Sequence, residues 1–424
     1  MKLSIVAKTY WDKSFARVMA WCLVFGLCAD VGAGAKIPIL GWGTFPQEMA
    51  SEERYAEAKE AGFTHLTQMC KTHADAKRLL SYAERAGIKL AIGYAMHGTN
   101  GIMRMTAEAE ALTAAAKDSP ALGFYYVTDE PHVNMAESIR ECVNRYAALD
   151  PAHPCYVNLY GAMDEEHQRK FTGCATYGGY LSRLYGIVPL NMVSFDVYPI
   201  LSFKPLEKGL RLNGGLVILK ERWYETLETA SAFAREKGIP MYAFALATAH
   251  SHHPANPYPV PTREHLRLQM YSNLAYGAQL LQYFRYRAVI PAKKRGPLFE
   301  LIREMNQEIQ ARAIVFLGAK LQGAWHTGSK IPLGTSLLDQ KAMPPFVKSI
   351  SAPKHSTVLV SWLKNGGKDY LVVVNRDPND EMSFMASFAP GSDIVRRDGT
   401  RAKADAYEGL FWLDPGDAAV FTAP

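Results

Sequence analysis

The stretch Gly123-Phe-Tyr-Tyr-Val-Thr-Asp-Glu-Pro-His132 decides the fold of this chain. Its apolar first half is typical of a buried parallel strand, and it ends in two adjacent carboxylates and a proline. Because Pro131 cannot continue the strand, Asp129 and Glu130 are expected at its carboxyl end. In an eight-stranded α/β barrel this end forms the mouth of a pocket. Acidic residues before a helix also act as N-terminal caps, so this stretch alone leaves a structural role open.

The segments on both sides of this stretch repeat the same pattern. Short β-branched or aromatic runs alternate with longer amphipathic runs between Ile37 and Leu317, which indicates βα units and a parallel sheet. The expected strands are 39–42, 65–69, 90–93, 123–128, 155–158, 192–197, 241–245 and 279–284. The expected helices include 51–61, 74–86, 106–117, 135–149, 219–237 and 263–276. Eight such units favour a closed (β/α)8 TIM barrel of class α/β over residues 36–318.

The pattern changes after a last long helix expected at 297–316. Short strands at 357–363, 370–375 and 418–422 are separated by turn signals such as Asn365-Gly-Gly367. Residues 319–424 are therefore expected to form a small all-β sandwich packed against the barrel. Trp325, Trp362 and Trp412 are interpreted as core or interdomain anchors, with contact to carbohydrate as the alternative.

The first 35 residues have the pattern of a secretory signal peptide. Basic residues precede an apolar run from Val18 to Ala29, and Ala33-Gly34-Ala35 offers a small-residue cleavage site. The run is short for a membrane span, and no later stretch has the ~20 apolar residues that a span needs. The sequence predicts a secreted or periplasmic protein with no membrane span after cleavage. A lipoprotein anchor at Cys28 is less favoured because Leu27 precedes it.

The composition is that of an ordinary folded protein. Apolar residues make up 48% and charged residues 21%, and the formal net charge is +6. The basic residues are dispersed, so no nucleic-acid partner is expected. No Gly-x-Gly-x-x-Gly follows the first strand, so no nucleotide cofactor is expected either. After the signal segment the cysteines are Cys70, Cys142, Cys155 and Cys174, which we expect to be buried thiols. The sequence gives no indication of the oligomeric state.

Polar and aromatic side chains follow the ends of the expected strands. They are Trp42, Gln68, Tyr94, His97, Asn158, Tyr160, Asp196, Tyr198, His250, Tyr283, Arg285 and Tyr286. A sugar ring has an apolar face that stacks on an aromatic plane, and its hydroxyls need fixed donors and acceptors. This mixture predicts an oligosaccharide or glycan as the substrate.

Several of these segments resemble one group of enzymes. The stretch from Gly123 to His132, continued by Leu149-Asp-Pro-Ala-His-Pro154, resembles the acid-bearing region of bacterial secreted glycoside hydrolases whose barrel is related to clan A. Val193-Ser-Phe-Asp-Val-Tyr-Pro199 and the carboxy-terminal Tyr370-Leu-Val-Val-Val-Asn375 resemble the same group. The resemblance implies that Glu130 is the general acid. A carboxyl beside Tyr125 or Tyr126 and a proline is partly desolvated, which raises its pKa toward that role.

The sequence departs from this group at two positions. Asp129 stands before the glutamate, where the group usually has Asn, and the segment 243–250 at the seventh strand contains no carboxylate. Glycoside hydrolysis normally needs a second carboxylate. Asp196 is the first choice, held by a hydrogen bond from Tyr198, although it can also be a loop cap before Pro199. Alternatively, Asp129 orients a 2-acetamido group of the substrate while Glu130 gives the proton.

Two other kinds of function stay open. The missing strand-seven carboxylate is compatible with a non-catalytic glycan-binding protein on a degenerate barrel. His250-Ser-His-His253 could bind a metal ion, but a polar turn is the favoured interpretation and no metal site is predicted. No Gly-x-Ser-x-Gly elbow supports a serine nucleophile.

Overall fold

The computed structural model describes residue 34 and residues 36–94, 103–202, 217–220, 222–250, 258–291, 295–407 and 409–424. The predicted signal segment, residues 1–35, lies almost wholly outside them, so export stays a prediction. Among the described residues, no helix combines the length and the apolar character that crossing a membrane requires.

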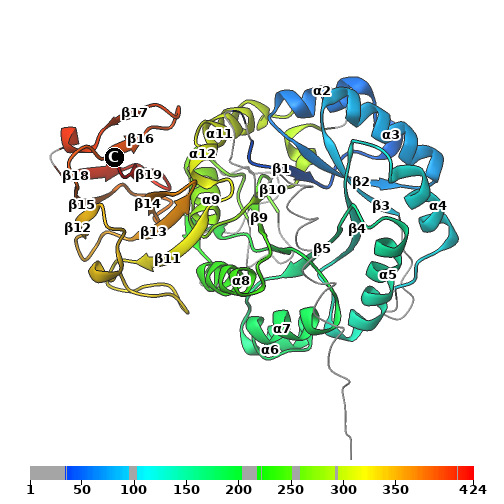
Figure 1. Cartoon of the computed structure of the whole chain (residues 1–424), viewed down its shortest axis with the longest axis horizontal. Coiled ribbons are helices and arrows are strands. Elements are labelled where there is room, and N and C mark those ends of the chain that lie inside the picture. The colour runs from blue at the N-terminus through cyan, green and yellow to red at the C-terminus, as the bar shows by residue number, and fades with distance from the viewer. Residues whose placement is uncertain are drawn as a thin grey trace, which may run out of the picture.

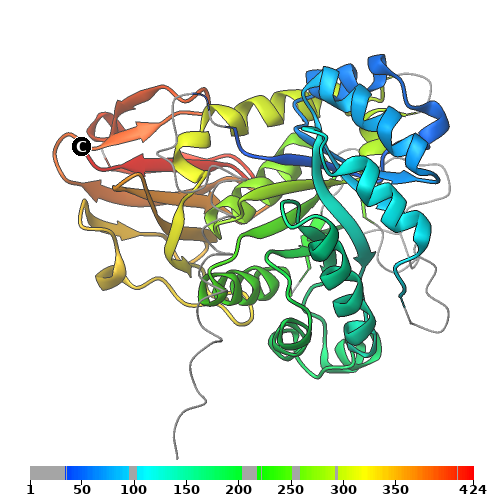
Figure 2. The ribbon, with the colours of Figure 1, turned by 45° about the vertical axis from the view of Figure 1, so that its right-hand side comes forward.

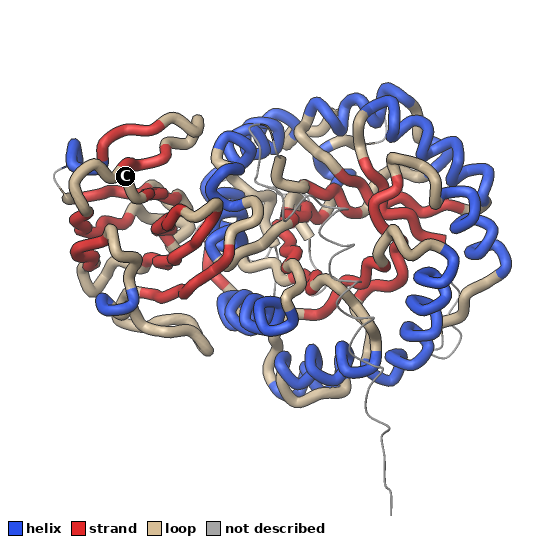
Figure 3. The backbone as a smooth tube through the Cα atoms, in the orientation of Figure 1, coloured by secondary structure: helices blue, strands red, loops and turns tan. Residues whose placement is uncertain are grey.

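Eight parallel strands close into a barrel, which confirms the predicted fold class (Figure 3). The order around the barrel is β1-β10-β9-β6-β5-β4-β3-β2. The bounds are β1 Ile39–Trp42, β2 His65–Cys70, β3 Lys89–Tyr94, β4 Leu122–Asp129, β5 Cys155–Tyr160, β6 Val193–Asp196, β9 Met241–Leu246 and β10 Leu280–Phe284. Each strand lies within two residues of its predicted limits at either end.

Helices surround this ring (Figure 1). They are α2 Glu52–Glu60, α3 His73–Ala86, α4 Ala107–Ala116, α5 Ala136–Leu149, α6 Glu165–Thr172, α7 Tyr177–Ile187, α8 Trp223–Lys237, α9 Arg263–Ala275, α10 Tyr286–Val289, α11 Phe299–Ala311 and α12 Ala313–Phe316. The predicted start of a helix at Leu219 is wrong, because Val217–Leu219 forms β8 and pairs with β7, Ile200–Ser202. The single helix predicted at 297–316 is divided at Arg312 into α11 and α12.

Successive side chains of each barrel strand point to opposite faces, and this divides the hydrophobic core into two parts. Residues such as Leu40, Phe124 and Tyr156 face inward and fill the barrel. Their sequence neighbours, such as Ile39 and Tyr125, face outward and join the larger cluster between strands and helices. This division follows from the two-residue period of a strand and determines which strand-end side chains can reach the barrel mouth.

Two antiparallel sheets follow the barrel (Figure 2). The first has the order β11-β13-β14-β19-β16-β17, and the second has the order β12-β15-β18. Their bounds are β11 Lys320–His326, β12 Val347–Ser351, β13 Val358–Asn365, β14 Lys368–Asn375, β15 Met382–Phe388, β16 Asp393–Val395, β17 Arg401–Lys403, β18 Leu410–Leu413 and β19 Ala418–Thr422. Stacked rings such as Phe388 and Phe421, with centroids 4.4 Å apart, fill the space between the sheets.

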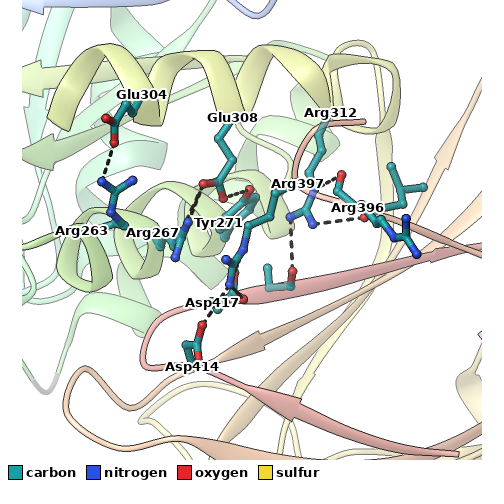
Figure 4. Close-up of polar contacts among 12 residues, drawn as sticks. Arg263, Arg267, Tyr271, Glu304, Glu308, Arg312, Arg396, Arg397, Asp414 and Asp417 are labelled. Atoms are coloured by element: carbon teal, nitrogen blue, oxygen red, sulfur yellow. Dashed lines mark hydrogen bonds and ion pairs between the residues drawn. The ribbon is translucent and has the colours of Figure 1, made fainter. Parts of the chain in front are cut away.

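Polar contacts join α9 to α11 and connect Arg312, directly after α11, to the six-stranded sheet (Figure 4). The guanidinium of Arg312 donates to the carbonyls of Val395 and Arg396 at 3.1 Å and of Ala418 at 3.2 Å. Glu308 accepts from Tyr271 at 2.6 Å and from Arg267 at 2.8 Å. Side chains of β13 and β14 also belong to the barrel's outer hydrophobic cluster. Because the two parts share a core, the division at residue 318 stays a prediction.

Candidate active site

A β-bulge in β4 sets the direction of the Asp129 side chain. The pairing of β4 with β5 shifts between Tyr126 and Thr128, so Tyr126 lies opposite Tyr156 and Asp129 lies opposite Asn158. Tyr126 and Tyr156 both contact the interior cluster. Without the extra residue, Asp129 would have the opposite orientation to Tyr126 and face the helices. With it, Asp129 faces the barrel mouth.

Asn158 joins two of the carboxylates. Its Nδ2 donates to Asp129 Oδ1 and to Asp196 Oδ1, each at 3.0 Å. Its Oδ1 accepts from Ser194 Oγ at 3.0 Å, and Ser194 accepts from Gln282 Nε2 at 2.9 Å. The amide has one acceptor and one donor end, so the bond from Ser194 keeps the donor end toward the carboxylates. A chain of buried polar side chains across three strands thus holds Asp129 and Asp196 together.

Glu130 completes this acidic cluster. Its carboxyl lies near enough to the side chains of Asp196 and Tyr160 for both to affect its pKa, while its backbone N–H donates to the carbonyl of Asn158 at 2.9 Å. Its φ is 46°, which lies in the left-handed region that non-glycine residues rarely adopt. Such strain costs on the order of 1 kcal/mol and is common where a side chain is held for function. The backbone geometry thus turns Glu130 toward Asp196.

Proximity and burial raise the pKa of all three acids. Burial, then the charges of Asp196 and Asp129, raise the pKa of Glu130 to about 8. Burial and the charge of Asp129 raise the pKa of Asp196 to about 7, although Asn158 and Tyr198 stabilise its ionised form. Asp129 is exposed to the open mouth, yet the protein around it raises its pKa as well, opposed by the bond from Asn158. Because the carboxyls interact, they titrate as a unit in which Glu130 holds its proton near neutral pH.

Four rings, which we call the aromatic wall, lie beside the acids: Trp42, Tyr198, His250 and Phe284. The Tyr198 ring stacks on Phe284 at 5.2 Å between centroids, and its Oη donates to Asp196 Oδ2 at 3.2 Å. Trp42 packs against Phe284 at 5.5 Å, and His250 lies 5.2 Å from the same ring. A cavity of about 620 Å³, whose lining includes Trp42 and Tyr126, opens next to them. Flat rings beside carboxylates are the surfaces that a pyranose needs.

Three predicted binding residues lie on the outer faces of their strands, and we correct two of them, Tyr94 and Tyr283. Gln68 lies on the outer face of β2, where its Oε1 accepts from Thr44 and from Tyr55 of α2 at 3.3 Å, but it also lines the cavity of about 620 Å³, so its role in binding stays a prediction. Tyr94 packs against the cluster between strands and helices. Tyr283 donates from its Oη to Asn306 of α11 at 2.9 Å. The three residues were predicted to bind substrate because they are close to strand ends. Successive side chains of a strand point to opposite faces, and these three lie on the outward face.

The remaining predicted residues have different positions. Arg285 is exposed just beyond β10, and its stem lies beside Gly43 in the loop after β1. His97 and His253 lie outside the described residues. In the described part of the chain, no cluster of three or more His, Cys, Asp or Glu has a metal-binding arrangement. The four cysteines described are buried free thiols.

Sequence reasoning missed Lys220. Its backbone N–H donates to the carbonyl of Pro199 at 2.6 Å, directly after β8. Burial lowers the pKa of this lysine, and the charges of Asp196 and Glu130 partly oppose that effect. Lys220 therefore lies within electrostatic reach of Asp196 and Glu130. No motif marks it, because only the folding of the β7–β8 hairpin brings it to the barrel mouth.

Comparisons with known proteins identify the fold. No protein-family model and no curated protein matches the chain. A solved family 39 glycoside hydrolase from Bacteroides cellulosilyticus is similar, with a TM-score of 0.51 and 11% identity over 92% of this chain and 81% of that one. An alpha-L-fucosidase from Paenibacillus thiaminolyticus has a TM-score of 0.42 at 11% identity, covering 91% of this chain and 95% of that one. The likeness to the family 39 enzyme shows the fold alone, a TIM barrel followed by β-sheets, which the sequence predicted.

The raised pKa of Glu130 predicts a stability change on neutralising it. Its pKa in the folded protein is about 8 against an ordinary value of 4.5, so the folded state binds the proton more tightly. Wild type therefore loses stability as pH rises from about 4.5 to about 8, and Glu130→Gln lacks this loss. We expect the variant to gain about 1 kcal/mol of unfolding free energy at about pH 9 and little at about pH 4.

Thermal unfolding of wild type and Glu130→Gln at these two pH values checks the expectation. Glu137→Gln is the matched control, because Glu137 lies on the surface of α5 in an exposed ion pair with Arg140. If Glu130→Gln gains the same unfolding free energy at both pH values, the gain does not come from the raised pKa of Glu130.

Proposed function

We propose that this protein hydrolyses an O-glycosidic bond of an oligosaccharide or glycan, with Glu130 as the general acid and base. The observation that carries the proposal is the meeting of Asp129, Glu130 and Asp196 at the carboxyl end of the barrel, beside an aromatic wall. Within that cluster, Glu130 has a raised pKa and carries a proton near neutral pH. A protonated carboxyl beside an ionised one is the pairing that protonation of a leaving sugar oxygen requires.

The contact between Glu130 and Asp196 bears on the stereochemical course. An inverting enzyme keeps its two carboxyls about 6.5–9.5 Å apart to hold a water between them. Glu130 and Asp196 are close enough for each to affect the pKa of the other, and this proximity favours the shorter spacing of about 5 Å at which a retaining enzyme works by double displacement. In the first step, Asp196 forms a bond to the anomeric carbon as the bond to the leaving oxygen breaks and Glu130 protonates that oxygen. In the second, Glu130 removes a proton from water, which displaces Asp196.

Substrate assistance is the second route compatible with the same cluster. There the 2-acetamido oxygen attacks the anomeric carbon, and a carboxylate orients the amide. Asp129 supports this route because it faces the open mouth and is held by Asn158. Under this scheme the substrate carries an N-acetylhexosamine, whereas Asp196 acts on other sugars.

A panel of aryl glycosides and soluble glycans tests the proposal. Wild type is expected to release the aryl group or sugar from at least one member, and the reducing product identifies the sugar. The apolar end of β9, with Phe244 and Leu246 facing inward, favours a non-catalytic glycan-binding protein as the alternative. Binding to members of the panel without turnover of any of them would establish that alternative.

A further inference from the structure

The three-stranded sheet presents an aromatic surface far from the barrel mouth. The six-stranded sheet contacts α9 and α12, so the outer face of β12, β15 and β18 points away from the barrel (Figure 1). Trp412 is 61% exposed on this face, Met385 is 59% exposed and Leu410 is 47% exposed. The neighbouring residues Phe411 and Leu413 face inward and belong to the core between the sheets. An exposed tryptophan of this degree is unusual for a side chain that serves only the core.

Hydroxyl groups lie on the same face as these apolar side chains: Ser349, Ser351 and Ser387 are exposed, and Ser383 is buried. The register places Ser383 directly opposite Trp412 and Met385 directly opposite Leu410. On the next strand, Ser351 lies opposite Met385, and the hydroxyls of Ser349 and Ser387 are 2.7 Å apart on the exposed face. A flat ring with hydrogen-bonding groups at its sides matches a sugar ring, which has an apolar face and equatorial hydroxyls.

A cavity of about 670 Å³ continues this surface at the free edge of β18. Its lining includes Trp412 and a second aromatic side chain, Tyr407, which is 38% exposed. Arg396 and Asp398, both exposed, supply charges of opposite sign. Two aromatic rings and polar side chains thus border one cavity beside the last strand of the sheet.

We propose that this surface, defined by Trp412, Tyr407, Met385 and Ser351, is a second carbohydrate-binding site that takes a neutral polysaccharide chain. It holds a polymer to the protein independently of the barrel mouth. The choice of a carbohydrate as ligand rests in part on the proposed function. A second copy of the chain is a poorer occupant, because a stable dimer buries about 800 Å² per partner, whereas the two aromatic side chains Trp412 and Tyr407 together supply at most about 300–500 Å². Serines between the apolar side chains also break the patch.

Affinity electrophoresis tests the site with defined probes. Separate gels contain hydroxyethylcellulose, xylan, glycol chitin or laminarin, and each is compared with a polymer-free gel. Wild type and Glu130→Gln are expected to be retarded alike in at least one of them. Trp412→Ala should weaken that retardation about tenfold or more, as truncation of a central aromatic does, and Trp412→Phe should keep part of it.

Leu337→Ala is the matched control, because Leu337 is also 61% exposed but lies outside the surface. It should migrate as wild type does. Trp412→Ala should also hydrolyse small aryl glycosides at the wild-type rate. The assay on aryl glycosides thus tests the proposed catalytic function, and the gels test the proposed second binding site. Wild type that is retarded in no gel, or Trp412→Ala that is retarded as strongly as wild type, overturns the proposal. So does a dimer in sedimentation that Trp412→Ala abolishes.

Discussion

Glu130→Gln is expected to lower kcat/KM on oligosaccharides by about 10²- to 10⁴-fold, the range that one general acid contributes. Glutamine keeps the size and the contacts with Asp196 and Tyr160, but it has no proton to give to the leaving oxygen. Because the side chain volume is unchanged, KM should move far less than kcat. The fold should also be retained, since the variant removes a group whose ionised form is disfavoured.

Two controls make this result interpretable. Glu137→Gln removes an exposed carboxylate from α5 and should leave kcat and KM unchanged. Thermal unfolding of Glu130→Gln should show a melting temperature at or above that of wild type. Activity of Glu130→Gln within a few-fold of wild type would remove Glu130 from the mechanism.

Asp196→Asn is expected to lower kcat by about 10²- to 10³-fold, comparable to the loss of one group that stabilises developing charge. Asp196 is held by bonds from Asn158 and Tyr198 and faces the carboxyl of Glu130. The substitution should also shift the alkaline limb of the pH–rate profile to lower pH. The negative charge of Asp196 helps to raise the pKa of Glu130, so its removal lets Glu130 lose its proton earlier.

Three further variants help to interpret the loss of kcat in Asp196→Asn. Tyr198→Phe removes one bond to Asp196 and should cost less than Asp196→Asn itself. Asp118→Asn, at an exposed position, should have no effect. Asp129→Asn distinguishes nucleophilic attack by Asp196 from substrate assistance. If Asp129→Asn lowers kcat more than Asp196→Asn does, and only on N-acetylhexosaminides, the reaction is substrate-assisted. An alkaline limb that stays in place in Asp196→Asn would contradict the coupling between Asp196 and Glu130.

The barrel could be predicted from the sequence because parallel strands buried on both faces have continuous apolar runs. The resemblance of the acid-bearing stretch agreed with that architecture. The small strands β16 and β17, three residues each, carry too little pattern to be found. The helix α8 was predicted to begin early, because Val217–Leu219 is apolar and reads equally well as a helical or an extended segment.

The direction of the site side chains was harder to predict. Strand ends can be located, but the face on which a side chain lies changes with every residue. Gln68 and Tyr283 end on the outer face for this reason, although both stand near a carboxyl end. Asp129 reaches the mouth only because β4 has a bulge, and nothing in Tyr126-Val-Thr128 signals one. The position of Lys220 depends on the pairing of β7 with β8, in which paired residues are between 15 (Ser202 and Val217) and 19 (Ile200 and Leu219) residues apart in sequence. Local sequence patterns do not encode contacts over such a separation.

The most direct test of the central claim is the dependence of Glu130→Ala on the leaving group. Wild type and variant would be compared on dinitrophenyl, nitrophenyl and phenyl glycosides of the sugar that the panel identifies. A dinitrophenolate leaves without protonation, so the variant should approach wild type on that substrate and lose about 10²- to 10⁴-fold on the phenyl glycoside. A loss of the same size on all three substrates would show that Glu130 does not protonate the leaving oxygen.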